Sequence, residues 1–133
     1  MFGTFQQTTL RVEIEASAAE IRNSLLQPRQ FRRWLWPQQF SPGLPDVLQP
    51  GLTFKGYLGP IEIQHQVTDT PPQRLCLLLS GGIDGFHEWY WGEGWVQSRL
   101  EGVSLLPLNL AQTVSLLRLQ RFLKAQVHDQ RTL

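Results

Sequence analysis

A chain of 133 residues is long enough for one domain around one hydrophobic core and too short for two, so we expect a single domain over residues 1–133. Its 12 basic and 11 acidic residues nearly cancel to a formal net charge of +1, which gives no long-range field toward polyanions. A nucleic-acid partner is therefore not expected.

The cysteine content and the N-terminal segment bear on the cellular compartment. Cys76 is the single cysteine of the sequence, which excludes an intramolecular disulfide and favours a reducing environment. The N-terminus lacks the basic and apolar regions of a signal peptide, and no apolar run is long enough to cross a bilayer. We therefore expect a cytoplasmic protein without a transmembrane segment.

The N-terminal part of the chain predicts a strand followed by two short helices. Apolar and polar residues alternate over residues 9–15, which is the period of a half-buried strand. Ser17 and Glu20 then match a capping box, which predicts the start of a helix. Pro28 suits the first turn of a second helix that ends at Trp36.

A loop is predicted at residues 37–51, because four prolines and two glycines deny a helix there. Loops of this length are often functional, so the segment is either a lip over a pocket or a surface crossover. The helix before it carries a basic and aromatic cluster formed by Arg29, Arg32, Arg33, Trp34 and Trp36. That cluster predicts either contact with an anionic head group or a transient membrane contact, or a solvated helix face whose aromatic residues turn into the core.

The middle of the chain predicts an antiparallel meander, because turns rich in Gly and Pro separate its apolar runs too closely for crossover helices. The predicted strands span 52–58, 61–69, 74–80, 85–91 and 95–104. Alternation in the second of them places His65 on the inner face with the aliphatic residues. The third is apolar on both faces around Cys76, which fits either a strand covered on both sides or an oligomer contact. The oligomeric state stays open.

The last segment predicts a long helix over 108–127 that is apolar on two sides. One sector holds Leu116, Leu119, Leu123 and Val127, and a broader one holds Leu110, Ala111, Val114, Leu117, Phe122 and Ala125. A helix of this kind is usually buried against more than one layer. We expect it to pack against the sheet on one side and the first helix on the other.

Three stretches of the sequence resemble the START-related superfamily, also called SRPBCC or birch-pollen-allergen-like. VEIEASAAEIRNSLLQPRQFRRWLWP resembles its opening strand and two short helices, and LPLNLAQTVSLLRLQRFLKA its closing helix. TDTPPQRLCLLLSGG, with the preceding Val67, resembles its V-x-x-x-x-P-x-R-L strand pair. The resemblance implies an α+β helix-grip fold, in which a curved antiparallel sheet wraps around the long C-terminal helix beside an internal cavity. Relatives in this superfamily include lipid carriers and polyketide cyclases.

An aromatic segment at residues 86–91 is the densest chemical feature of the sequence. Alternation puts His87, Trp89 and Trp91 on one face, and we expect that face to be the inner one because two indoles bury much apolar area. Such a wall suits a flat apolar ligand bearing one polar group, and the alternative is a filled aromatic core with a hydrogen-bonded histidine. The predicted ligand-binding residues are Trp34, Trp36, Phe54, Ile63, His65, His87, Trp89, Trp91, Val114 and Leu117.

Candidate groups for chemistry are few. His65, Cys76 and His87 match no metal-ligand spacing, so no metal is expected, and no cofactor motif occurs. His65 or His87 is a weak candidate for moving a proton, because imidazole titrates near neutrality. No sequence signature of nucleotide binding or of a hydrolytic triad is present.

These observations favour a non-catalytic protein that binds or transports a small hydrophobic ligand, such as a lipid, a quinone or an aromatic or polyketide-like molecule, between the sheet and the closing helix. One alternative is a cyclase or dehydratase in which a cavity histidine is the acid or base. The other is a module with a filled cavity that binds a protein partner through an exposed apolar patch. The sequence does not identify the ligand.

Overall fold

The computed structural model describes residues 3–35 and 38–132, with side chains as far as residue 126. The chain begins with a strand, continues through two short helices and a run of strands, and closes with a long helix. The elements are β1 (Thr4–Glu13), α1 (Ala18–Leu26), α2 (Pro28–Trp34), β2 (Gln39–Phe40), β3 (Thr53–Leu58), β4 (Ile61–Asp69), β5 (Arg74–Gly81), β6 (Ile83–Gly92), β7 (Trp95–Ser104) and α3 (Leu108–Thr132). This order confirms the predicted α+β class.

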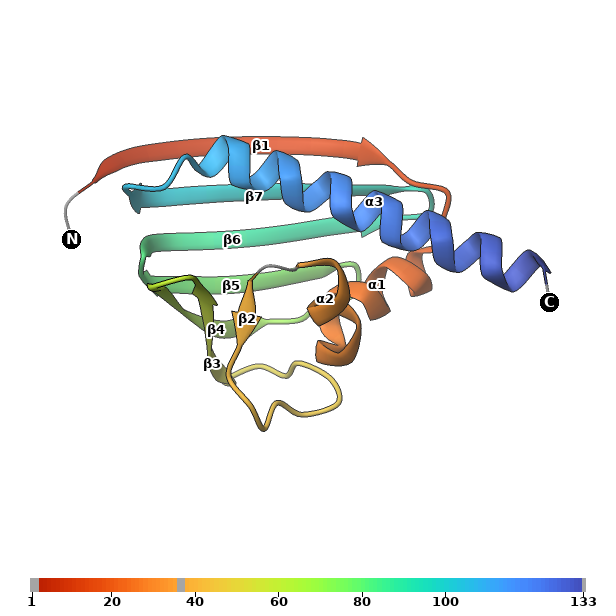
Figure 1. Cartoon of the computed structure of the whole chain (residues 1–133), viewed down its shortest axis with the longest axis horizontal. Coiled ribbons are helices and arrows are strands. Elements are labelled where there is room, and N and C mark those ends of the chain that lie inside the picture. Colours follow the sequence, from red (N-terminus) through yellow and green to blue (C-terminus); the bar gives the residue numbers. More distant parts are fainter. Residues whose placement is uncertain (1–2, 36–37, 133) are drawn as a thin grey trace.

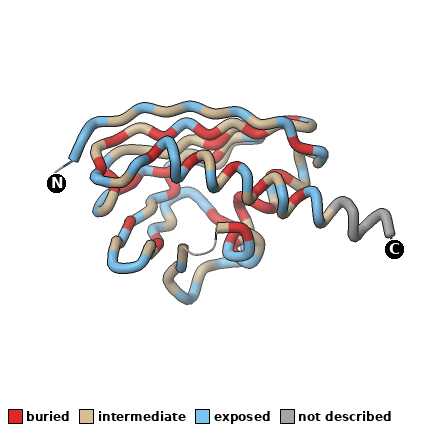
Figure 2. Tube along the Cα trace, turned by 45° about the horizontal axis from the view of Figure 1, so that its top comes forward, coloured by how far each residue is buried: buried red, intermediate tan, exposed pale blue. Residues whose placement is uncertain are grey.

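The strands form one antiparallel seven-stranded sheet in the order β1-β7-β6-β5-β4-β3-β2. α3 crosses the face of the sheet at β1 and β7, and the short helices α1 and α2 contact α3 near the end of that face (Figure 1). Buried positions alternate with exposed ones along the strands and gather where the helices meet the sheet (Figure 2). The arrangement is the predicted helix grip, with the core between the sheet and the three helices.

Two glycines face each other where β6 pairs with β7. Gly85 and Gly102 are direct cross-strand partners. A Cβ atom added to Gly85 would lie 1.9 Å from the carbonyl oxygen of Glu101, so a side chain there would push the strands apart. The absence of side chains at this pair permits a close backbone approach that suits the curvature of the sheet around α3.

The predicted helix starts are confirmed, whereas two strand predictions need correction. Ser17 caps α1, and Glu20 returns the second hydrogen bond of the capping box. β1 begins at Thr4, five positions before the predicted start at Thr9, because the polar residues there pair with β7 along the whole strand. The predicted loop at 37–51 contains the short strand β2, which pairs with β3.

The orientation of α3 corrects the second half of the helix prediction. Its sheet-facing stripe consists of Leu108, Gln112, Leu116, Leu119 and Leu123, which are all buried. Leu110, Val114 and Leu117 were expected inside, but their side chains are 60%, 41% and 47% exposed. They face away because the sheet covers only one side of the helix, and α1 and α2 contact α3 only near the end of the sheet face.

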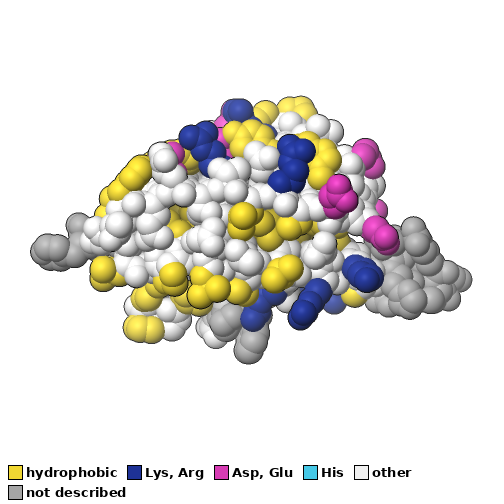
Figure 3. All heavy atoms as spheres, turned by 90° about the horizontal axis from the view of Figure 1, so that it is seen from above, with side chains coloured by type: hydrophobic (Ala, Val, Ile, Leu, Met, Phe, Trp, Pro, Cys, Tyr) yellow, Lys and Arg dark blue, Asp and Glu magenta, His cyan; other side chains and the backbone are white. Residues whose placement is uncertain are grey.

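The outer surface is mixed rather than uniformly apolar. Seen from the side of β1, apolar side chains lie between basic and acidic ones (Figure 3). On β5 the inward residues Leu75, Leu77 and Leu79 are buried, and the outward Leu78 is 50% exposed. A second layer over this strand is therefore not found in the described part of the chain, and an oligomer contact stays a prediction. None of the helices, as far as they are described, is long and apolar enough to cross a membrane.

Candidate functional site: a cavity between the sheet and the closing helix

A cavity of about 140 Å³ lies between the concave face of the sheet and the three helices. Its wall is built mainly from Leu and Ile side chains of α1 and of β3 to β7, with aromatic and polar groups between them. The aromatic and polar wall residues are Phe31, Trp34, Gln38, Phe40, Phe54, His65, His87, Trp89, Gln112 and Ser115. Among the residues that the structure describes, no Asp, Glu, Lys or Arg side chain lines this cavity.

The loop after α2 forms one side of the cavity. Gln38, Phe40 and Leu48 of the predicted loop segment all line it, as expected for a lip over a pocket. Leu48 is anchored there because its backbone N–H donates to the carbonyl of Leu26 at 2.8 Å. Phe40 packs edge-on against Phe31 of α2, with ring centroids 5.0 Å apart. The segment is thus part of the wall rather than a surface crossover.

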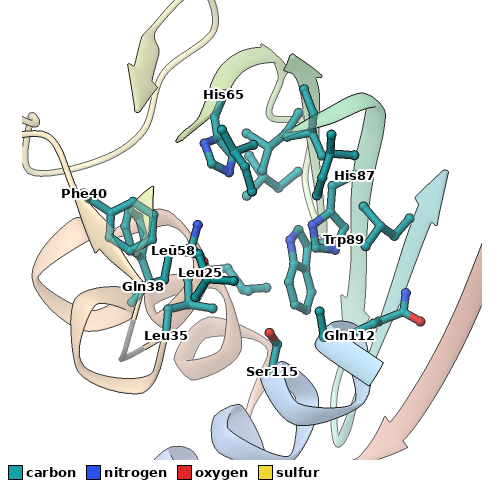
Figure 4. Close-up of a pocket in the computed structure, with 18 of the residues that line it drawn as sticks. Leu25, Leu35, Gln38, Phe40, Leu58, His65, His87, Trp89, Gln112 and Ser115 are labelled. Atoms are coloured by element: carbon teal, nitrogen blue, oxygen red, sulfur yellow. The ribbon is translucent and has the colours of Figure 1, made fainter. Parts of the chain in front are cut away.

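β6 supplies the opposite side, and its alternation was predicted correctly. His87, Trp89 and Trp91 share the inner face, and Trp89 and Trp91 are buried. Trp89 and His87 lie 4.5 Å apart between ring centroids and both line the cavity, on the side facing the lip (Figure 4). Trp89 also meets Trp34 of α2 edge-on, at 6.0 Å between centroids.

A buried polar chain ties His87 to α3 and to β1. The Nε2 atom of His87 lies 2.6 Å from the hydroxyl of Ser98 on β7. The amide nitrogen of Gln112 donates to that hydroxyl at 3.0 Å and to the carbonyl of Ser98 at 2.8 Å. The hydroxyl of Thr8 donates to the amide oxygen of Gln112 at 2.9 Å, and Asn109 donates to Thr8 at 2.9 Å. A polar residue in the apolar stripe of α3 is therefore satisfied and fixed.

His65 lies on β4, two strands from His87 in the sheet, in a different environment. Its ring stacks on Phe54 with centroids 4.8 Å apart and an interplanar angle of 3°. Its Nδ1 atom is enclosed and has no hydrogen-bond partner among the described residues. Buried polar atoms without partners are rare in folded proteins, so this nitrogen is available to a polar group inside the cavity.

Both imidazoles are neutral at physiological pH. Burial lowers the pKa of His65 to about 4, against a smaller opposing effect of the backbone at Ile63 and Phe54. Burial lowers the pKa of His87 to about 3, and the nearby imidazole of His65 lowers it further. The cavity therefore offers neutral hydrogen-bonding groups rather than a cationic site.

Six of the ten predicted ligand-binding residues line the cavity, namely Trp34, Phe54, Ile63, His65, His87 and Trp89. Trp91 is buried in the core and does not reach the wall. Val114 and Leu117 do not line the cavity, because both lie on the outward side of α3. Trp36 lies outside the described residues.

The sequence reasoning missed Gln112 and Ser115, which contribute the polar part of α3 to the wall. Gln112 carried a usable signal, because a polar residue four positions from both Leu108 and Leu116 interrupts the buried stripe. Ser115 carried none, since a small polar residue also suits an exposed helix position.

The three arginines of the basic cluster on α2 are exposed, and contact with a head group or a membrane stays a prediction. Arg32 donates to the carbonyl of Ser41, and the guanidinium of Arg33 lies 5.1 Å from the ring centre of Phe122. Phe31 and Trp34 turn into the core.

Within the described residues, no group of three His, Cys, Asp or Glu side chains is arranged to hold a metal ion.

No protein-family model matches the chain, and no curated protein matches it in sequence. Solved structures do match its fold. CV1439 from Chromobacterium violaceum superposes with a TM-score of 0.71 at 14% identity, covering 88% of this chain and 96% of that one. The Aha1 dimer from Colwellia psychrerythraea gives 0.64 at 20% identity, covering 89% and 96%.

A third match is DynU16, from the dynemicin biosynthetic locus, with a TM-score of 0.66 at 17% identity. The match covers 89% of this chain and 47% of DynU16. At such identities the likeness shows the fold alone. This chain shares with these proteins an α+β architecture, a sheet with a C-terminal helix.

Proposed function

We propose that this protein is a START-related, SRPBCC-type protein that binds a small hydrophobic molecule and does not convert it. The observation that carries the proposal is the cavity itself, a hollow of about 140 Å³ with an apolar wall and a few neutral polar groups. Ligand sites in proteins are typically concave and mostly apolar, with a small number of placed polar groups.

The volume of the cavity limits the size of the ligand. An engineered apolar cavity of about 150 Å³ stays dry and takes up benzene, whereas drug-sized ligands occupy pockets of about 300–1,000 Å³. A hollow of about 140 Å³ therefore suits a molecule with one ring, or the ring end of a longer one. Among the ligands expected from the sequence, an aromatic molecule or a quinone ring fits this volume better than a lipid with two chains.

The environment of the histidines supports binding rather than proton transfer. A group with a pKa of about 3 or 4 is protonated in only about one molecule in a thousand or fewer at neutral pH, so it is a poor general acid. The described cavity wall also holds no carboxylate that could orient either imidazole. The cyclase or dehydratase alternative thus has weaker support than the binding function.

The partner-binding alternative required a filled interior. The described residues leave a cavity instead, and its lining includes the indole and the imidazole of β6. The outward stripe of α3 remains exposed, but exposure alone does not identify a partner.

A cavity-filling variant tests the proposal. Ser115 points its hydroxyl toward the cavity from α3 (Figure 4), whereas the neighbouring Val114 faces outward. Native mass spectrometry of the purified protein, followed by solvent extraction, should reveal an apolar molecule on the wild type and on Val114→Phe. The same molecule should be absent from Ser115→Phe.

Two results would contradict the proposal. One is equal retention of the molecule by Ser115→Phe and the wild type. The other is a wild-type protein that carries nothing and fails to bind any member of a panel of single-ring aromatic molecules and quinones.

A further inference from the structure

We propose that the polar chain from Gln112 through Ser98 locks His87 as a hydrogen-bond donor into the cavity, so that the ligand is an uncharged ring compound carrying an acceptor oxygen. This inference rests on the proposed binding function and adds the chemical class of the ligand.

The orientation of the Gln112 amide is the first step. A backbone carbonyl only accepts hydrogen bonds, so the carbonyl of Ser98, at 2.8 Å, must face the amide nitrogen rather than the amide oxygen. The hydroxyl of Thr8 then donates to the amide oxygen at 2.9 Å. The same amide nitrogen donates to the Ser98 hydroxyl oxygen at 3.0 Å and to the carbonyl of Thr8 at 3.2 Å, so its two hydrogens are shared among three acceptors.

The direction of the Ser98 hydroxyl is the second step. Its oxygen accepts from Gln112, and the other group in contact with it is Nε2 of His87 at 2.6 Å. If Nε2 carried a hydrogen, the hydroxyl hydrogen of the fully buried Ser98 would have no acceptor among the described residues, which is costly. Ser98 therefore donates to Nε2, and the ring hydrogen of the neutral imidazole sits on Nδ1.

The third step concerns the hydrogen-bond donors at the cavity that have no acceptor. Within the described residues, the hydrogen bond of the His87 ring is the one between Nε2 and Ser98, which leaves Nδ1 free, and the indole N–H of Trp89 beside it has no protein partner. Figure 4 shows the two rings side by side on β6, next to the open space. Two adjacent donors cannot satisfy each other, and an accepting atom placed in the cavity beside both rings would satisfy them. A carbonyl or ether oxygen of a ligand is such an atom.

The side chains of the cavity wall indicate the charge of the ligand. A carboxylate in the cavity would face neutral donors and no basic side chain among the described wall residues. Burying an unpaired charge in apolar surroundings is much more costly than burying a neutral carbonyl that receives hydrogen bonds. The site therefore favours ketones, aldehydes, quinones and related neutral oxygen compounds.

The tautomer can be measured without any ligand. Long-range ¹H–¹⁵N correlation of the histidine rings in the wild-type protein at neutral pH distinguishes the protonated from the unprotonated ring nitrogen, and loss of the signals in His87→Leu assigns them. The proposal expects hydrogen on Nδ1 of His87. Hydrogen on Nε2 would overturn it, whatever the cavity binds.

Three probes of similar shape test the ligand class: acetophenone, which has a neutral acceptor; cumene, which has a methyl group in its place; and benzoate, which is charged. We expect the ratio of acetophenone to cumene affinity, measured by calorimetric titration, to fall roughly five- to tenfold in His87→Leu, since one hydrogen bond is lost. Val114→Ala, on the outward side of α3 and outside the polar chain, is the control and should keep the wild-type ratio. Benzoate should bind at least tenfold more weakly than acetophenone.

The outcomes separate the two proposals. If none of the three probes binds, the binding function fails for single-ring molecules, while the tautomer measurement still decides the state of His87. If cumene binds and the affinity ratio is unchanged in His87→Leu, the cavity is a binding site but His87 is not its donor. Benzoate binding as tightly as acetophenone would overturn the assignment of an uncharged ligand.

Discussion

At the scale of single residues, the buried imidazoles link folding to pH. Both have pKa values in the folded protein, about 4 for His65 and about 3 for His87, that lie below the ordinary value of 6.5. The unfolded chain therefore binds more protons than the folded one at any pH between those limits. Their contribution to stability is complete above about pH 6.5 and is lost as the pH falls toward about 4 for His65 and about 3 for His87.

The resulting prediction concerns the slope of stability against pH. Below about pH 6.5 the two histidines should together lower the free energy of unfolding by up to roughly 2.7 kcal/mol per pH unit, because each contributes at most about 1.4. Urea unfolding followed at intervals from neutral to mildly acidic pH measures the slope. His65→Gln and His87→Gln should each remove about half of this component. A double variant with the wild-type slope would show that these side chains are not the titrating groups.

At the scale of elements, the decisive feature is which face of α3 meets the sheet. Leu119 is fully buried in the sheet-facing stripe, whereas Leu117, two positions earlier, is 47% exposed. Leu119→Ala should cost about 2–5 kcal/mol of unfolding free energy, since it removes buried methyl groups and leaves a cavity. Leu117→Ala should change the same quantity by less than about 0.5 kcal/mol. Chemical denaturation of the two variants makes the comparison, and equal losses would contradict this placement of the helix.

Elements that depend only on residues close together in the chain could be predicted from the sequence. The capping box at Ser17 and Glu20 lies within four consecutive positions, and the alternation along β6 requires only that one face be buried. The outward sector of α3 was misassigned because a count of apolar residues does not reveal how many layers cover a helix. β2 escaped notice because two residues are too few for a periodic pattern.

The residues of the candidate site also divide into those with a local sequence signal and those whose partners are distant in the chain. The imidazole and the indole of β6 were found from strand alternation, which is local. Gln112 was not, because its partners Ser98 and Thr8 are 14 and 104 positions away in the chain. The meaning of a buried amide depends on those distant partners, and one sequence does not show them.

At the scale of the whole molecule, the cavity is a place where packing is left incomplete. The sheet grips α3 through the stripe from Leu108 to Leu123, while the lip segment and the β6 rings stand apart from each other across the hollow. Side chains that line a void lose contacts on one side, so an empty cavity costs stability. A ligand that fills it restores those contacts in the folded state only, and binding and stability are therefore coupled.

This coupling predicts a thermal shift that depends on the cavity. A probe present at ten times its dissociation constant should add about 1.4 kcal/mol to the free energy of unfolding, which corresponds to a rise of roughly 5 °C in Tm for a domain of this size. Differential scanning calorimetry with acetophenone should show this rise for the wild type and for Val114→Phe. Ser115→Phe should show almost none, because its ring occupies the space that the probe would fill. A shift of equal size in all three proteins would place the binding site elsewhere on the molecule.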